Sequence, residues 1–152
     1  MMKAYFYSLL FTTILLFSWV LVGCEPLEGY VLEPAGGYVF YDKGSYSDGW
    51  RYLECALEDV GGDVVSWEQA QTACEAYTYG RYKDWRLPTR AELSALYNNL
   101  HKKGIGNFAG KYWSSEQREE YKGNKAYYFD FDDGSIHTAE SSSYRVRPVR
   151  QF

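Results

Sequence analysis

Cys24 is the residue whose chemistry is easiest to read, because it closes the tetrad Leu21-Val22-Gly23-Cys24 at the end of an apolar segment. Lys3 places one positive charge ahead of that segment, which is typical of a signal peptide that the mature chain loses. Small residues before a cysteine suit a signal peptidase, and the thiol can then carry a diacylglyceryl group. We therefore predict a signal peptide over residues 1–23 and lipidation at Cys24. A retained membrane anchor is the alternative, since about 20 apolar residues can span a bilayer.

Lipidation would place the chain in the bacterial cell envelope, on the outer membrane or the cell surface. Several acyl chains hold a protein on a membrane where a single chain binds only marginally. Residues 24–36 contain Pro26, Pro34 and Gly36 and predict an irregular tether. Residues 37–152 then form one domain, which is long enough to bury a core of its own.

Cys55 and Cys74 are the remaining thiols, and an exported location permits a disulfide between them. Two buried, unpaired thiols are the alternative, and the sequence leaves both open. His101 and His137 are the histidines of the chain, and neither cysteine lies in a CxxC pair. A structural zinc site requires four closely spaced ligands, so we expect no metal and no cofactor.

Clustered carboxylates at Asp130, Asp132 and Asp133 are candidate calcium ligands, because hard cations prefer oxygen. The glycine at position 134 comes one residue too early for an EF-hand loop, and Ser141 stands where that loop requires glutamate. The pattern favours a solvated hairpin whose turn is Asp133-Gly134.

Arg145, Arg147 and Arg150 recur near the end of the chain and are candidates for an anion clamp, since guanidinium groups bind anions in bidentate fashion. Structural pairing with carboxylates at the rim of the core is the interpretation that we favour.

The mature chain is rich in aromatic residues, with 14 Tyr, 4 Trp and 5 Phe remaining after Cys24 becomes the first residue. Tyrosine offers a large contact area at low entropic cost, so it is enriched in binding surfaces. We predict a ligand site on the loops 117–125 and 139–144, and expect Trp85 and Trp113 in the core. The residues proposed for this site are Tyr121, Asn124, Tyr128, Tyr144 and Arg145.

Charge excludes one class of partner. The mature chain has 15 basic and 20 acidic residues, because Lys3 is the charge lost from the 16 and 20 of the whole chain. A net charge near −5 argues against nucleic acid and other broad polyanions. A glycan or an extracellular or envelope protein is the expected partner. Catalysis is not expected, since the chain lacks serine-hydrolase, zinc-protease and phosphate-loop motifs.

The elements that must position these residues alternate between strand and helix patterns. Residues 38–41 and 50–54 predict paired strands, and the turn between them contains Ser47-Asp48-Gly49. Capping boxes at Ser66 and Thr89 predict two helices, which Gly80 and Gly104 should end. Further strands are expected at residues 112–115, 126–132, 135–139 and 144–150, with Pro148 at an edge or an end. The order predicts an α+β domain with helices segregated from an antiparallel sheet.

Several segments together resemble the Lcl C-terminal-domain family, a bacterial group of largely unknown function. They are Gly37-Tyr38-Val39-Phe40-Tyr41-Asp42-Lys43-Gly44, Ser47-Asp48-Gly49-Trp50-Arg51-Tyr52-Leu53-Glu54, Asp84-Trp85-Arg86-Leu87-Pro88-Thr89, Glu92-Leu93, Tyr112-Trp113-Ser114-Ser115 and Arg145-Val146-Arg147-Pro148-Val149-Arg150. They extend over nearly the whole mature chain. The resemblance implies a C-type-lectin-like fold, with two helices packed on a small twisted antiparallel sheet.

Two departures from C-type lectins and one from the Lcl C-terminal-domain family bear on function. No cysteine follows Cys74, so the helix-to-last-strand disulfide of those lectins is missing, and their calcium-site tripeptides are absent from the loop region. Residues 56–65 stand where family members often have a longer Gly/Thr/Asn-rich stretch. The formylglycine-generating oxidases, which share a related fold, use a late cysteine pair that this chain lacks.

The sequence therefore predicts a membrane-anchored surface lipoprotein with a non-catalytic, adhesin-like domain for a ligand or partner. A structural envelope lipoprotein without a small ligand is the first alternative, and an enzyme related to the formylglycine-generating oxidases is the second. Exposed aromatic side chains grouped on one face would favour the binding domain over the structural protein.

Overall fold

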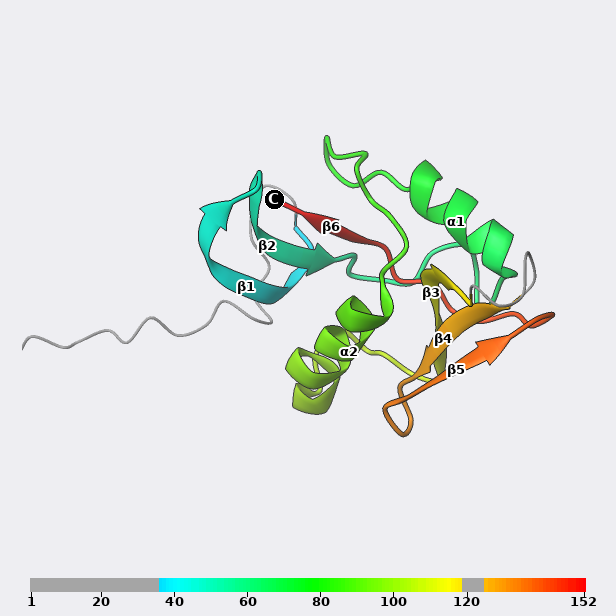
Figure 1. Cartoon of the computed structure of the whole chain (residues 1–152). Coiled ribbons are helices and arrows are strands. Elements are labelled where there is room, and N and C mark those ends of the chain that lie inside the picture. Colours follow the sequence, from blue (N-terminus) through cyan, green and yellow to red (C-terminus); the bar gives the residue numbers. More distant parts are fainter. Residues whose placement is uncertain (1–35, 119–124) are drawn as a thin grey trace, which may run out of the picture.

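In a computed structural model of the chain, we describe residues 36–118 and 125–152. Two three-stranded antiparallel sheets and two α-helices make up this α+β domain (Figure 1). The first sheet has the strand order β1-β2-β6 and the second has the order β3-β4-β5. The predicted class is confirmed, but the domain has two small sheets where the sequence predicted one.

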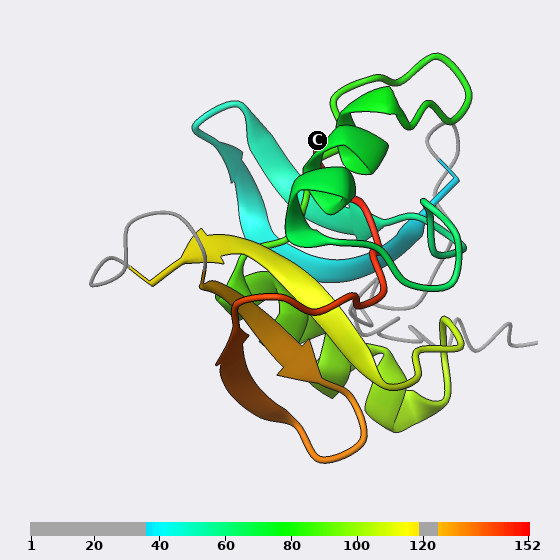
Figure 2. The same ribbon diagram turned by 90° about the vertical axis from the view of Figure 1, so that its right-hand side faces the viewer.

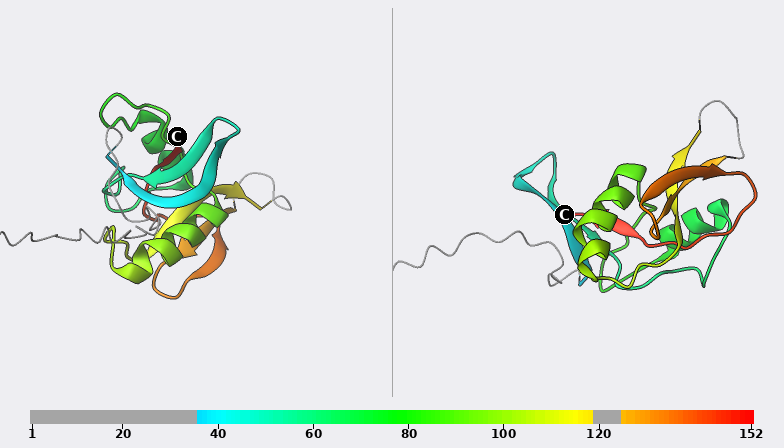
Figure 3. Two further views of the ribbon diagram at one scale, coloured as in Figure 1. Left: turned by 90° about the vertical axis from the view of Figure 1, so that its left-hand side faces the viewer. Right: turned by 90° about the horizontal axis from the view of Figure 1, so that it is seen from below.

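The first sheet is formed by β1 (Tyr38–Ser47), β2 (Trp50–Cys55) and β6 (Val149–Gln151). Asp48 and Gly49 connect β1 to β2 with φ angles of 49° and 83°, which is why a residue tolerant of positive φ and a glycine stand there. The register of β1 against β2 shifts twice, so β1 bends around the sheet. Figure 3 shows the far end of this hairpin projecting away from the helices.

The second sheet is formed by β3 (Lys111–Gln117), β4 (Ala126–Asp130) and β5 (Ser135–Ala139). The expected two-residue turn at Asp133-Gly134 is wrong. Four residues, 131–134, connect β4 to β5, and Asp130 pairs with Ser135. The amide of Phe131 donates to the carbonyl of Gly110, and the carboxylate of Asp132 accepts from the amide of Gly110, so contacts with the segment before β3 hold these two residues in the turn.

Both helices begin where the capping boxes predict. The side chain of Ser66 accepts a hydrogen bond from the amide of Gln69 at the start of α1 (Trp67–Ala76), and that of Thr89 accepts from the amide of Glu92 at the start of α2 (Arg90–Asn99). Helix α1 ends four residues before Gly80, because Tyr77 is extended and packs edge-on against Trp85 at 5.3 Å. After α2, the short 3-10 helix η1 (His101–Lys103) ends at Gly104 in the left-handed conformation.

Two hydrophobic clusters hold the layers together. The α2 core joins the leucines of α2 to both sheets, and the α1 core packs α1 against β3 (Figure 2). The α2 core contains Phe40, Leu53, Cys55, Leu93, Leu96, Leu100, Phe108, Tyr112, Phe129, Phe131 and Val149. The α1 core contains Ala70, Cys74, Leu87, Trp113, Ala126 and Val146. Since α2 contacts both sheets, it fixes how the second sheet lies relative to the first.

The final segment crosses from one sheet to the other, as the red ribbon of Figure 1 shows. Arg145 forms a parallel bridge to Tyr112 on β3, whereas Val149 pairs with Cys55 on β2. Pro148 lies between the two contacts, and β6 begins directly after it. Because proline lacks an amide donor, it divides the predicted strand 144–150 into two separate contacts.

Candidate functional site

An aromatic surface, which we call the aromatic ledge, is formed by Tyr128, His137 and Tyr144. The ring centroids of Tyr128 and Tyr144 are 4.4 Å apart, and His137 stacks on Tyr128 at 5.4 Å. The two tyrosines are half-buried and His137 is exposed. Trp113 supports the ledge from below, 4.6 Å from Tyr144, and is itself 1% exposed. Its indole nitrogen donates to the carbonyl of Val65 at 2.8 Å, so the support is fixed in orientation.

The polar groups at the ledge include the hydroxyl of Tyr128 and the ammonium group of a neighbouring lysine. Burial and the neighbouring phenol of Tyr144 raise the pKa of Tyr128, so its hydroxyl stays protonated. The ammonium group of Lys111 lies 5.6 Å and 5.9 Å from the ring centroids of Tyr128 and Tyr144. It also pairs with Asp130 at 3.8 Å. The ledge thus combines aromatic faces with the hydroxyl of Tyr128 as a hydrogen-bond donor and the ammonium group of Lys111 as a nearby cation.

A polar groove, which we call the serine groove, continues from the ledge. Its cavity of about 500 Å³ lies between the start of α1 and the loop that follows β5. The lining residues are Ser66, Trp67, Glu68, Glu140, Ser141, Ser142 and Ser143. Val65 and Tyr144 exchange backbone hydrogen bonds of 2.9 Å and 3.0 Å, which hold the groove directly beside Tyr144. Serine hydroxyls and glutamate carboxylates are groups that bind hydroxyl-bearing ligands.

The structure brings together two of the five predicted ligand residues, Tyr128 and Tyr144. Arg145 instead pairs with Asp59, with 3.4 Å between its Nη1 atom and the carboxylate oxygen, so the structure does not bring it together with the two tyrosines. Neighbouring residues on an extended chain point to opposite sides, and Tyr144 takes the side of the ledge. Tyr121 and Asn124 lie outside the described residues.

His137 belongs to the ledge but was missed by the sequence reasoning. A two-residue turn at Asp133-Gly134 would have paired Tyr128 with Ala139, whereas the observed register pairs Tyr128 with His137. Cross-strand partners share one face of a sheet, so the wrong turn length hid the contact. Lys111, Ser66 and Glu68 come to the site only through tertiary packing.

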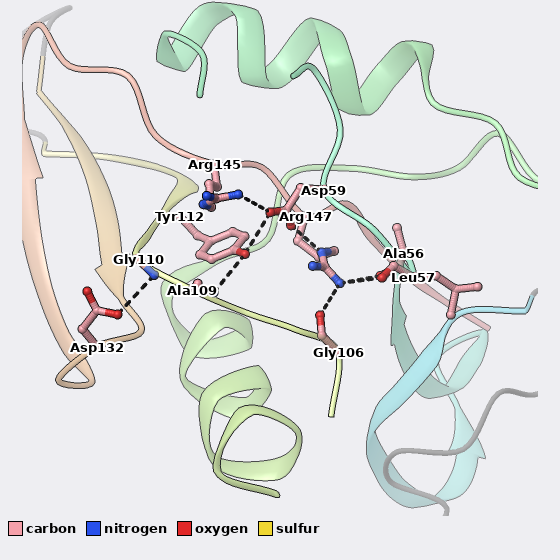
Figure 4. A network of polar contacts seen from close by, with 10 residues as sticks. All are labelled: Ala56, Leu57, Asp59, Gly106, Ala109, Gly110, Tyr112, Asp132, Arg145 and Arg147. Atoms are coloured by element: carbon pink, nitrogen blue, oxygen red, sulfur yellow. Dashed lines mark hydrogen bonds and ion pairs between the residues drawn. The ribbon is translucent and has the colours of Figure 1, made fainter. Parts of the chain in front are cut away.

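The three late arginines do not converge on a common anion site. In the network of Figure 4, Asp59 binds Arg147 at 2.6 Å as well as Arg145, and the hydroxyl of Tyr112 donates to it at 3.0 Å. The side chain of Arg147 is 3% exposed and also donates to the carbonyls of Ala56, Leu57 and Gly106. Burial and the charge of Asp59 raise the pKa of Tyr112 to about 12.

Arg150 has a separate pair of partners, Glu54 at 2.7 Å and Asp84 at 2.9 Å. Glu54 is fully buried, and burial raises its pKa although Arg150 and the amide of Gly37 bind the charged form. These contacts are structural pairings with carboxylates, as the sequence favoured. The contacts of Arg145 and Arg147 connect residues 56–59 to the last part of the chain.

The carboxylates of the β4–β5 turn accept hydrogen bonds from backbone amides. Asp130 accepts from the amide of Asp132, Asp132 accepts from the amide of Gly110, and Asp133 accepts from the amide of Ser135. Within the described part of the chain, no group of three or more His, Cys, Asp or Glu side chains is arranged to hold a metal ion.

Asp133, Ser135 and His137 meet on the exposed surface of this hairpin, a grouping that the sequence reasoning did not foresee. The hydroxyl of Ser135 donates to Asp133 and lies 2.6 Å from the Nε2 atom of His137. A nucleophilic triad places the imidazole between serine and carboxylate, so that the ring removes the serine proton. Here the serine lies in the middle, and the contacts orient the imidazole of His137 on the ledge.

Cys55 and Cys74 are free, so the disulfide that the sequence allowed is not formed. Cys55 lies in the α2 core and Cys74 lies in the α1 core, so the two thiols belong to different hydrophobic clusters. Burial raises the pKa of each thiol to about 12.

The most exposed large aromatic side chains lie away from the ledge. Tyr46 at the end of β1 is 71% exposed, and Tyr41 and Tyr79 are each 40% exposed. The ammonium of Lys43 lies 3.9 Å from the ring centroid of Trp50 on the same hairpin. These exposed aromatics are dispersed over the β1–β2 hairpin and the loop of Tyr79, and they are not grouped on one face with the ledge. By the grouping criterion they do not favour the binding domain, so the hairpin and the ledge must be tested separately. Across residues 36–118 and 125–152, no helix has the length and apolar character needed to cross a membrane.

A search of curated proteins found no relative that matches this chain. The family of the Lcl C-terminal domain matches residues 47–150, which run from the end of β1 to the middle of β6. The matched region contains Asp59, Arg147 and the whole ledge. The chain therefore belongs to the Lcl C-terminal domain family.

Proposed function

We propose that this protein is a lipid-anchored surface lipoprotein whose domain recognises a glycan without catalysing a reaction. The observation that carries the proposal is the aromatic ledge next to the serine groove. Half-exposed Tyr128 and Tyr144 provide flat apolar faces, and the groove, whose Ser143 precedes Tyr144 in the chain, provides hydroxyl and carboxylate groups. An extracellular or envelope protein is the alternative partner for the same surface.

The chemistry of the site favours a neutral sugar. Pyranose rings have an apolar face that stacks on an aromatic ring, and their hydroxyl groups exchange hydrogen bonds with serine and glutamate. Glu68 and Glu140 give the groove acidic character, although Glu140 pairs with Lys125 at 2.8 Å. Broad binding of a sulfated polyanion is therefore disfavoured.

A C-type-lectin-like fold is part of the proposal. Two helices, two small antiparallel sheets and a chain end that pairs with β2 near the start of the domain support it. In such a fold a rigid scaffold carries the binding loops, and here Trp113 and the Val65–Tyr144 bridge fix the ledge to that scaffold.

The anchor is tested independently of the ligand. Cys24→Ala should abolish incorporation of labelled palmitate and release the protein from the membrane fraction or leave an uncleaved precursor. If this variant still incorporates the label and fractionates as the wild type does, lipidation at Cys24 is excluded.

The ligand is tested with residues 25–152, which retain both hydrophobic clusters. This chain should bind at least one neutral glycan on an array, also in the presence of a chelator. Tyr128→Ala/Tyr144→Ala should weaken that binding at least about 10-fold, because buried aromatic anchors dominate interface energies. Tyr41→Ala/Tyr46→Ala is the matched control, since it removes two tyrosines from the hairpin and should bind normally.

Three results would change the assignment. Binding lost in the hairpin variant and kept in the ledge variant would move the site to β1. Binding only to envelope proteins would replace the glycan by a protein partner. A wild-type domain that binds neither class would favour the structural envelope lipoprotein.

A further inference from the structure

The chain enters the described domain beside a loop that is rich in tyrosine. We call residues 77–83 the tyrosine loop; they follow α1 and read Tyr-Thr-Tyr-Gly-Arg-Tyr-Lys. Tyr79 and Tyr82 exchange backbone hydrogen bonds of 3.3 Å and 3.1 Å, so the loop folds back on itself in a tight turn. Gly36, the first described residue, is buried against this loop, because a Cβ atom added to it would lie 2.7 Å from the ring of Tyr79. The chain that precedes Gly36 therefore starts at the tyrosine loop.

The tyrosine loop has exposed aromatic and cationic groups. Tyr79 is 40% exposed. Arg81 and Lys83 are both exposed, and neither forms an ion pair with a described residue. Asp84, the acid that follows the loop, is already paired with Arg150 at 2.9 Å. The loop thus presents two positive charges beside an aromatic ring.

A buried donor next to the loop has no acceptor among the described residues. The indole nitrogen of Trp85 is buried without a hydrogen-bond partner, whereas those of Trp67 and Trp113 donate to backbone carbonyls at 2.8 Å. Trp85 contacts the loop through Tyr77, whose ring packs edge-on against it at 5.3 Å. Because buried N–H groups are nearly always paired, Trp85 points to an acceptor outside residues 36–118 and 125–152. The tether, which joins the domain at Gly36, can supply one.

The sequence of the tether complements this surface. Residues 24–35 contain three acidic residues and no basic residue. They also contain an apolar run at 30–32, Tyr-Val-Leu, which a purely solvated linker does not require. Glu33 comes three residues before Gly36, and Glu28 comes eight residues before it. An extended chain spans about 3.3–3.6 Å per residue, so both acids can reach a loop that contacts Gly36.

We propose that residues 27–35 dock on the tyrosine loop of the same chain. The apolar run of the tether covers the ring of Tyr79, and Glu28 and Glu33 face the two cations of the loop. Covalent continuity identifies this segment as the occupant, because a segment joined to the surface is present there at an effective concentration on the order of millimolar. Opposite charges on the two segments favour the same pairing.

Acidic residues near the loop limit where the tether can lie. Glu75 is exposed on the last turn of α1. Burial raises the pKa of Tyr77, and the nearby charge of Glu58 adds to this effect. Both acids would repel those of the tether. Because both are on the Tyr77 side of the loop, the acids of the tether are expected at the side of Arg81 and Lys83.

A docked tether would also orient the domain on the membrane, a consequence that rests on the proposed lipidation at Cys24. Residues 24–26 alone would then separate the lipid from the docked segment, and three residues span at most about 10 Å. Figure 1 shows the tyrosine loop, between α1 and α2, at the top of the domain and β5 at the bottom, and the same separation is visible in Figure 2. The loop would therefore face the membrane, and the aromatic ledge would face away from it.

Carbodiimide cross-linking of residues 25–152 tests the contact directly, because this reagent joins a carboxylate only to an amine that it contacts. We expect mass spectrometry to find Lys83 linked to Glu33 or Glu28. Lys102, an exposed amine on η1, is the control and should not be linked to the tether. Lys83→Arg should abolish the cross-link, since it keeps the positive charge but removes the amine.

Urea denaturation of the same chain gives a second readout. Glu28→Lys/Glu33→Lys and Arg81→Glu/Lys83→Glu should each lower the folding equilibrium constant about 5-fold, which is the size expected for two exposed ion pairs. Each double variant places like charges opposite one another. Combining them restores opposite charges, so the combined variant should return to within about 2-fold of the wild type.

The matched control for this rescue reverses two other exposed cations, Lys102 and Lys103 on η1. Lys102→Glu/Lys103→Glu combined with the reversed tether should show no rescue, and the two losses should add. Because residues 25–152 lack the anchor and no glycan is added, neither readout depends on the proposed function. Failure of the docked tether is therefore distinguishable from failure of the lipid anchor or of the glycan site.

The proposal is overturned if Lys83 forms no cross-link to the tether, or if the tether and loop reversals add as they do in the η1 control. Amides of the tyrosine loop that become protected from hydrogen exchange only after vesicles of phosphatidylglycerol are added would also overturn it. That result would assign the surface to lipid headgroups.

Discussion

Asp59→Asn tests whether the network in Figure 4 is a structural element of the fold. The substitution keeps the shape of the side chain but removes the charge that faces Arg147 at 2.6 Å. The side chain of Arg147 is 3% exposed and that of Asp59 is 15% exposed, so the guanidinium would keep its charge in a nearly dry environment. Breaking a buried ion pair from one side costs about 3–5 kcal/mol.

The lower end of that range applies, because Arg147 still donates to the carbonyls of Ala56, Leu57 and Gly106. We expect the free energy of unfolding to fall by about 3 kcal/mol, which is about 2 M in the urea midpoint for a domain of this size. Urea denaturation followed by circular dichroism measures it. Asp63→Asn, at an exposed position in the same loop, is the control and should change stability by less than about 0.5 kcal/mol.

Two results would refute this reasoning. One is a loss below about 1 kcal/mol, which would place Asp59 with ordinary surface charges. The other concerns the double variant Asp59→Asn/Arg147→Met, which removes the stranded charge together with its partner. It should be more stable than the sum of the two single losses predicts, because the pair is coupled. Strict additivity would mean that the contact between them contributes nothing.

Three further predictions concern single groups. Native protein should not react with a thiol reagent at Cys55 or Cys74, because burial raises each thiol pKa from 9.0 to about 12 and makes the thiolate roughly a thousandfold rarer. In unfolded protein both thiols should react. A disulfide in the native protein would contradict this prediction. Glu92→Gln should lower the free energy of unfolding at pH 7, and this loss should become smaller as the pH falls through the lowered pKa of Glu92. Burial alone would raise the pKa of Glu92, but the hydrogen bonds from Arg86 and the Thr89 amide lower it below 4.5. The charged Glu92 side chain therefore stabilises the fold above that pH, and this stabilisation is lost as the pH falls. An effect of the substitution that does not depend on pH would contradict the pairing. Thr89→Ala should cost about 1 kcal/mol by removing the cap of α2, measured by urea denaturation against the exposed control Thr72→Ala.

The sequence alone determined the features that depend on neighbouring residues. Both helix starts were predictable, because a capping box satisfies its own amides within four residues at Ser66 and at Thr89. The turn at Asp48-Gly49 was predictable because it requires positive φ. The motifs that carry the family resemblance also follow the chain directly, and the family match extends from residue 47 to residue 150. Local chemistry was sufficient in each case.

Only the tertiary structure decided the contacts that make the site. Contacts of Phe131 and Asp132 with Gly110 hold the longer turn after β4, and in the register that follows this turn His137 lies opposite Tyr128. Asp59 and Arg147 are 88 residues apart in sequence, and no local pattern says that they pair. Cys55 and Cys74 were compatible with a disulfide until the two cores separated them. Strand register and side-chain pairing depend on which surfaces are buried together, and that burial is a property of the whole fold.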